Sequence, residues 1–140
     1  PGAVRELAFA RLLHVRQLVG QFLSGAAPAT LVRGLRSVTL AHAPEYRAEA
    51  SSLSRWLVER LVACGLKADT PFHIEALPAS DQDSLSVKFN YDDARRFFWH
   101  GNFATHQATF DANFGGETVR LPSTVSLLAP EVALAEALFF

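Results

Sequence analysis

Two stretches in which side chains alternate between polar and apolar meet at an adjacent pair of glycines, Gly115 and Gly116. Residues 103–110 alternate on one side of the pair, and residues 117–121 alternate on the other. A period of two around a Gly-Gly dipeptide is typical of a β-hairpin, because glycine adopts the positive φ that the turn requires. The pattern predicts a hairpin over Phe103–Leu121 at the centre of a small sheet.

Hydrophobic periodicity along the rest of the chain predicts helices first and strands after. The expected helices are residues 4–23, 44–64 and 131–140, and the expected strands are residues 72–77 and 85–91. Residues 30–43 fit a short helix with an extended turn as well as a strand at Ser37–Leu40. Pro122 suits the first position of a further short helix. This order indicates an α+β fold rather than alternating βαβ units.

The chain is long enough, at 140 residues with 49% hydrophobic content, to bury a core of its own. We expect a helical N-terminal extension over residues 1–43 and an α+β domain over residues 44–140. Residues 1–60 carry eight arginines and four acidic residues, a net charge of +4, whereas residues 61–140 carry five basic and ten acidic residues, a net charge of −5. The two halves can attract each other within the fold, or the basic part can face RNA, an acidic protein or a membrane.

The first 43 residues also suggest a compartment. They contain five arginines and one acidic residue, Glu6, a bias typical of a mitochondrial targeting region or of the segment behind it. Cys64 is the only cysteine, which excludes an internal disulfide and fits a reducing environment. Glu131 and Glu136 interrupt the most apolar stretch, so we expect no transmembrane helix. The expected location is intracellular, in the mitochondrial matrix or the bacterial cytoplasm.

The residue types that carry out catalysis or bind metals show no recognisable spacing. Five histidines are spread along the chain, with no HExxH or CxxC motif among them. The glycine pair lacks the Lys-Ser/Thr that follows in a phosphate-binding loop. We therefore expect a non-enzymatic protein with no metal and no cofactor.

Three consecutive aromatic residues, Phe97-Phe98-Trp99, indicate a binding surface. Successive side chains of a strand point to opposite faces, so at least one of the three must be exposed or buried in a partner. Packing of the run in the core or in a turn explains it equally well. With Arg95 and Arg96 beside them, exposed rings could also stack on bases. The arginines expected to face RNA are Arg5, Arg11, Arg16, Arg33 and Arg36.

A second binding hypothesis centres on the glycine pair. Phe110, Ala112 and Phe114 precede Gly115 and Gly116 at alternate positions. Together they could form the floor of a groove in which an extended peptide pairs with a free strand edge, because glycine allows a second backbone to approach.

The segment Phe110-x-Ala-x-Phe-Gly-Gly, with Pro122 six residues beyond Gly116, resembles the stringent starvation protein B (SspB) family of ClpXP degradation adaptors. The resemblance covers roughly residues 52–130 and includes the helix and two strands that precede the motif. It implies a small Sm-like β-sheet with a packed helix, a groove for short extended peptides such as the ssrA tag, and a homodimer.

The comparison also leaves open a second interpretation. Members of the family carry a flexible tail that docks the ClpX unfoldase, and residues up to Phe140 contain no such motif, while residues 4–36 form a helical addition. The chain is therefore either a peptide-binding or protein-binding adaptor, or a structural subunit of an organellar ribonucleoprotein or another large complex.

Overall fold

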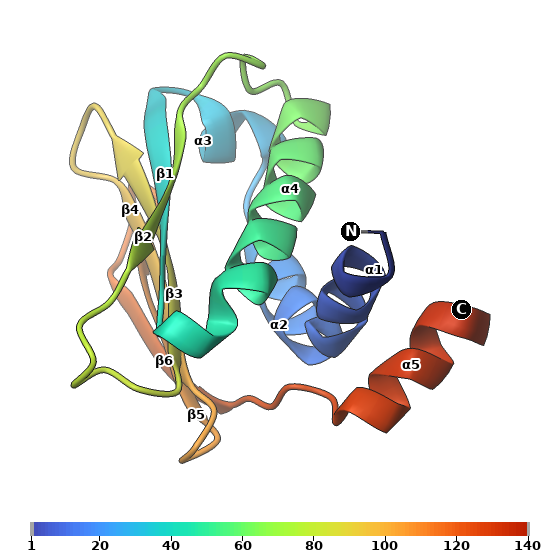
Figure 1. Cartoon of the computed structure of the whole chain (residues 1–140). Helices are drawn as coiled ribbons and strands as arrows, with labels where there is room; N and C mark the ends of the chain where they lie inside the picture. The colour runs from blue at the N-terminus through green and yellow to red at the C-terminus, as the bar shows by residue number, and fades with distance from the viewer. Residues whose placement is uncertain (1, 140) are drawn as a thin grey trace.

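A computed structural model describes residues 2–139 of the chain, with side chains from Glu6 onward (Figure 1). The helices are α1 (Gly2–Arg11), α2 (Leu13–Leu23), α3 (Pro28–Val32), α4 (Arg47–Ala63) and α5 (Pro130–Phe139), with a 3-10 turn, η1, over Pro44–Tyr46. The strands are β1 (Leu35–His42), β2 (Phe72–Ala76), β3 (Ser84–Tyr91), β4 (Arg96–Asn102), β5 (Gln107–Asn113) and β6 (Val119–Thr124). The α+β class expected from the sequence is confirmed, while the Sm-like assignment stays a prediction.

One sheet with the strand order β2-β1-β3-β4-β5-β6 forms the framework. Helix α4 connects β1 to β2, which pair in parallel, and β3 to β6 follow as an antiparallel meander. The expected hairpin exists as β5–β6, but residues 103–106 form the turn before β5 and are not part of its first strand. Its expected place at the centre of the sheet is wrong. The two central strands are β3 and β4, because β1 pairs with β3 across about 50 residues of chain and the meander then extends away from β1 to the edge at β6.

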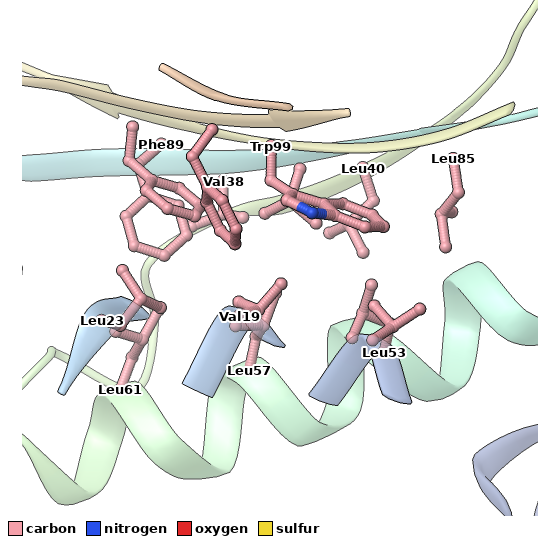
Figure 2. Close-up of a cluster of buried hydrophobic side chains, with 14 of the residues drawn as sticks. Val19, Leu23, Val38, Leu40, Leu53, Leu57, Leu61, Leu85, Phe89 and Trp99 are labelled. Atoms are coloured by element: carbon pink, nitrogen blue, oxygen red, sulfur yellow. The ribbon is translucent and has the colours of Figure 1, made fainter. Parts of the chain in front are cut away.

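The helices of Figure 1 cover one face of the sheet and leave the other open. Figure 2 shows side chains of α2 and α4 pointing toward the strands in a single buried layer. The layer contains Val19, Leu23, Leu53, Leu57 and Leu61 from the helices, and Val38, Leu40, Leu85, Phe89 and Trp99 from the strands. Each such side chain contributes about 1.5–3 kcal/mol when it leaves water, so this layer dominates the stability of the fold.

Local sequence explains the shape of α4, which covers the middle of the sheet. Leu53, Leu57 and Leu61 recur every fourth residue and are all buried. The helix ends where Gly65 adopts a φ of 110° and the Leu66 amide donates to the Leu61 carbonyl at 3.0 Å. This bond closes a Schellman-type cap, which favours glycine at the left-handed position.

The structure corrects several boundaries in the N-terminal third. The single helix expected over residues 4–23 is divided at Leu12 into α1 and α2. Residues 30–43, left ambiguous by the sequence, contain the end of α3 and the whole of β1. Residues 1–43 are thus not helical throughout, and α2, β1 and the elements after residue 44 share one core cluster.

The segment after β6 is also different from the expectation. Pro122 does not begin a helix but lies inside β6, and residues 125–129 are an extended connection to α5. Backbone and side-chain bonds fix this connection to the first helices: the Leu128 amide donates to the Arg11 carbonyl at 3.1 Å, and the Ser126 amide donates to His14 Nδ1 at 3.1 Å. Within residues 2–139, no helix is both long and apolar enough to cross a membrane.

Candidate peptide-binding site

A surface hollow of about 430 Å³ lies between the β5–β6 turn and the connection from α2 to α3. It is lined by Phe22, Gly25, Ala26, Ala27, Thr30, Ala112, Phe114, Gly116, Glu117 and Val119. Three of the residues expected to form a peptide groove, Ala112, Phe114 and Gly116, therefore meet at one place. The opposite wall, formed by the end of α2 and the segment after it, was not expected from the sequence.

Aromatic rings build the floor of this hollow. Phe22 lies flat on Phe110, with ring centroids 4.3 Å apart and planes only 3° from parallel. Phe114 is half-buried and contacts Phe97 and Tyr91, with its ring 6.3 Å from each of the other two. Ring pairs of this kind stabilise a fold by about 0.5–1.5 kcal/mol beyond the contribution of the apolar area that they bury. Phe22 and Phe114 both line the hollow, and Phe114 is the half-buried ring on the wall formed by the hairpin.

The rim at the glycine pair is shaped by backbone conformation. Gly115 has a φ of 101°, and its amide donates to the Asn113 side chain at 2.9 Å. A Cβ added to Gly115 or Gly116 would meet no atom within 4 Å. Glycine is thus required at Gly115 by conformation, and the space above both residues is open to a ligand.

The far wall of the hollow is tied to the sheet by Tyr91. Its hydroxyl donates to the Leu31 carbonyl of α3 at 2.6 Å. The Arg95 guanidinium lies 4.6 Å from the centre of the Tyr91 ring and donates to the Thr30 carbonyl at 2.8 Å. Burial raises the pKa of the Tyr91 phenol, so it stays protonated and donates this bond at any physiological pH.

The outer strand of the hairpin, β6, has a free edge whose pattern follows from Pro122. This residue lies opposite Thr109 in the antiparallel ladder, and proline has no N–H to donate. Pro122 must therefore occupy a pair without direct hydrogen bonds, in which backbone groups point away from β5. By the same alternation, Arg120 and Thr124 present both their N–H and C=O groups at the free edge, and Pro122 presents only its C=O.

Two apolar side chains mark the helix-facing side of this edge. Val119 is 44% exposed and Leu121 is 47% exposed, although each lies directly opposite a buried residue of β5. These cross-strand partners are Ala112 and Phe110, respectively. Helix α2 covers the sheet as far as Phe110, to which Phe22 is stacked, and β6 extends beyond this cover. The free edge thus combines unpaired backbone groups with uncovered apolar surface, next to the hollow.

Charges surround the site unevenly. Asp111 lies between two arginines on the open face, 3.0 Å from Arg96 and 3.8 Å from Arg120. Among the described residues that line the hollow, Glu117 is the charged one. Arg120 is 76% exposed, so it remains accessible to an acidic group on a ligand at the edge.

The aromatic run of β4 is divided between the two faces. Phe97 and Trp99 are fully buried and cannot contact a partner, whereas Phe98 is 37% exposed on the open face. Alternation along a strand separates neighbouring side chains in this way. Trp99 packs against Gly101, where an added Cβ would lie 2.8 Å from the indole ring. The expectation of at least one exposed ring is met by Phe98 alone within this run.

The arginines expected to face RNA have different surroundings. Arg11 donates to the Leu128 carbonyl at 3.1 Å, and Arg16 lies over the Phe9 ring at 3.7 Å, so both are used within the fold. Arg33 and Arg36 are exposed near the start of β1, where Arg36 lies 3.5 Å from Asp92. Arg5 belongs to α1, but its side chain lies outside the described residues.

Comparison with known proteins adds no assignment: no family model, curated protein or solved structure matches the chain. Within the described part of the chain, His, Cys, Asp and Glu side chains form no group of three or more that could hold a metal ion. The resemblance of residues 52–130 to the SspB family stays a prediction. The geometry of the hollow and of the β6 edge is therefore the basis on which a function can be proposed.

Proposed function

We propose that the chain binds extended peptide segments of a partner protein at the β6 edge, with one side chain of the peptide seated in the hollow. The observation that carries this proposal is the continuity of three features: the open ring of Phe114, the exposed Val119 and Leu121, and the unpaired backbone of β6. Strand addition obtains affinity from main-chain hydrogen bonds and specificity from alternate side chains.

The chemistry of the edge defines the peptide. Side chains on the helix-facing side would lie against Val119 and Leu121, so they should be apolar. Side chains at the intervening positions would lie on the open face near Arg120, which favours an acidic or polar residue there. The peptide should therefore alternate between apolar and acidic or polar residues. Its backbone would find no donor at Pro122, so one carbonyl of the peptide should remain bonded to water.

The experiment is selection of binders from a displayed library of random peptides, followed by calorimetry on the best sequence. N-methylation then removes backbone donors one at a time. Strand addition requires that methylation at alternate residues abolishes binding, while methylation at the residues between them is tolerated. Equal tolerance at all positions would contradict pairing with β6, even if the peptide binds.

Matched variants locate the bound peptide. Phe114→Ala and Val119→Asp should each weaken binding at least tenfold, because they remove the open ring and place a charge against the apolar side chains of the peptide. Phe98→Ala, which removes an exposed ring from the opposite face, is the control and should leave the affinity unchanged. If Phe98→Ala weakens peptide binding while Phe114→Ala does not, the peptide binds on the open face of the sheet, and the proposed site at the hollow is wrong.

A second candidate function is single-stranded RNA binding on the open face, as in a ribonucleoprotein subunit. It is favoured by the exposed Phe98, which has Lys88 and Asp111 opposite it in the ladder, with Arg96 and Arg120 on the same face. A base can stack on the ring while the cations contact phosphates. Binding would then fall steeply as salt rises and would be lost in Phe98→Ala. For either function, the mitochondrial matrix or bacterial cytoplasm stays our prediction of the compartment.

A further inference from the structure

A second apolar surface lies on the other side of the α2–α3 connection from the peptide-binding hollow, and Ala26 of that connection lines both. It is a groove of about 390 Å³ between the C-terminal halves of α2 and α4, and α3 closes one end. Its wall includes Gly20 and Leu23 from α2, and Trp56 and Leu61 from α4. Among the described residues that line it, Arg60 is the charged one, and it is exposed.

Glycine keeps this groove open. A Cβ added to Gly20 would lie 3.5 Å from the Trp56 ring, an ordinary contact distance. Because Gly20 lines the groove, the further atoms of a larger side chain at this position would occupy groove volume beside Trp56. The absence of a side chain at Gly20 thus leaves an apolar channel beside two packed helices.

Helix α5 has the complementary properties. One side of it packs on α1 through Ala133, which is fully buried. The remaining surface exposes Val132, Leu134, Leu138 and Phe139 by 52%, 53%, 67% and 77%. Large apolar side chains exposed together on one short helix are typical of an interaction surface.

The two surfaces match in length. The groove follows α4 from Trp56 to Cys64, about 12 Å along the helix axis at 1.5 Å per residue. On α5, the stretch from Glu131 to Phe139 also extends about 12 Å, and within it Leu134 and Leu138 are one turn apart, about 6 Å. Amphipathic helices dock into apolar grooves through side chains at this spacing.

The two surfaces also match in charge. Helix α5 carries two carboxylates, Glu131 and Glu136, and no cation, whereas the groove presents the Arg60 guanidinium. Glu136 faces Arg16 of its own chain, whose pKa it raises, opposing the larger lowering by burial. Glu131 lies on the exposed side with Leu134 and Leu138, and it is free to pair with Arg60 of another molecule.

A helix docked in the groove would come from a second copy. Figure 1 places α5 beside α1, at the end of α4 opposite to α3, whereas the groove lies at the α3 end. The bonds that hold residues 126 and 128 to the first helices keep α5 at that end. We propose that α5 of one copy docks in the α2–α4 groove of a second copy, with Leu134, Leu138 and Phe139 in the channel and Glu131 paired with Arg60.

The test is the mass of the purified chain in solution, measured by light scattering and sedimentation over a wide concentration range. Wild type should increase in mass with concentration. Leu138→Glu, which places a charge on the docking face of α5, and Gly20→Leu, which fills the groove, should each remain monomeric. Val62→Glu is the control: it adds the same charge to an exposed apolar position of α4 that does not line the groove, and it should associate like wild type.

Mixing the two monomeric variants identifies the contact. The intact α5 of Gly20→Leu can enter the open groove of Leu138→Glu, so an equimolar mixture should form a heterodimer. If α5 instead paired with α5, Gly20→Leu would still associate alone and the mixture would gain nothing. That result, or a wild type that stays monomeric throughout, would overturn the proposal.

Charge reversal gives a test that does not depend on filling the groove. Arg60→Glu changes an exposed side chain, so it should leave folding intact and weaken association roughly five- to tenfold. Glu131→Arg in the same chain should restore it. An Arg60→Glu chain that associates as tightly as wild type would exclude the pairing with Glu131. Circular dichroism and thermal unfolding of every variant establish that each is folded.

Discussion

The β3–β4 pair and the β5–β6 hairpin have the same alternation of side chains in their sequences, yet their apolar side chains are buried to different extents. Phe89 and Trp99 of the first pair are buried under α2 and α4, whereas Val119 and Leu121 of the second remain nearly half exposed. The difference comes from what covers each strand, since α2 covers the sheet only as far as Phe110. Alternation thus specifies which face a residue points to, and tertiary packing decides whether that face stabilises the fold or remains available for binding.

The largest expected effect tests the interior half of this comparison. Trp99→Ala should lower the free energy of unfolding by about 3–5 kcal/mol, because it leaves a cavity beside Gly101 under a fully buried ring. Urea denaturation followed by circular dichroism measures it. We call the exposed β6 side of the hairpin, with Val119 and Leu121, the margin of the sheet. A loss of stability below about 1 kcal/mol would mean that the interior is no better packed than this margin.

Phe114→Ala tests the boundary between interior and margin. Its half-buried ring contacts Phe97 and Tyr91 but is open to the hollow. We expect a loss of about 1–2 kcal/mol of stability, less than for a buried aromatic ring, together with the large loss of peptide affinity described above. Comparing denaturation with calorimetry separates the two effects. If the stability loss equals that of Trp99→Ala, Phe114 belongs to the core and not to a binding surface.

Among the residues whose side chains the structure describes, Glu49 on the first turn of α4 is the buried carboxylate. Burial raises the pKa of Glu49, and Arg11, 3.9 Å away, opposes that shift only in part. The folded state therefore holds this proton more tightly than the unfolded state, and stability falls as the pH rises from the ordinary pKa of glutamate, about 4.3, through the raised pKa of the folded state.

Glu49→Gln should remove this dependence. Relative to wild type, the variant should gain stability as the pH rises through that window and then show a constant difference. Thermal unfolding across the pH range measures it. Glu59→Gln, on the exposed side of the same helix, is the matched change, and an equal pH-dependent gain there would contradict the role of burial.

The smallest effect on stability is expected at the margin itself. Leu121→Thr places a β-branched residue, which suits a strand, in β6 and should change stability by no more than about 0.5 kcal/mol, because the leucine is 47% exposed. Its effect should appear in peptide affinity instead. A destabilisation of several kcal/mol would show that Leu121 is packed like the interior residues, and it would contradict the difference between β6 and the β3–β4 pair.

Sequence patterns predicted the elements whose signals are local. Helix α4 and strands β2 and β3 lie close to where periodicity placed them, and the glycine pair marks a true turn. Strand β1 stayed ambiguous because Leu35, Val38 and Leu40 fit two periods equally well. Its place in the sheet depends on pairing with β3, a long-range contact that no local pattern encodes.

Of the two walls of the candidate site, only the one formed by the hairpin could be predicted from the sequence. The Phe110–Gly116 pattern located the wall formed by the hairpin, but the wall from Phe22 to Thr30 requires the stacking of Phe22 on Phe110. The prediction that Pro122 begins a helix was wrong, because proline is common both at the first position of a helix and on an edge strand. Only the ladder with Thr109 decides between them.

The unequal placement of the two tryptophans has a spectroscopic consequence. Trp99 is sealed in the core, whereas Trp56 is half-buried and lines the α2–α4 groove. The intrinsic fluorescence of the protein therefore contains two separable signals, one sensitive to unfolding and one sensitive to occupancy of the groove. Trp56→Phe isolates the emission of Trp99 and Trp99→Phe that of Trp56, so folding and self-association can each be followed in a single-tryptophan variant without an attached dye.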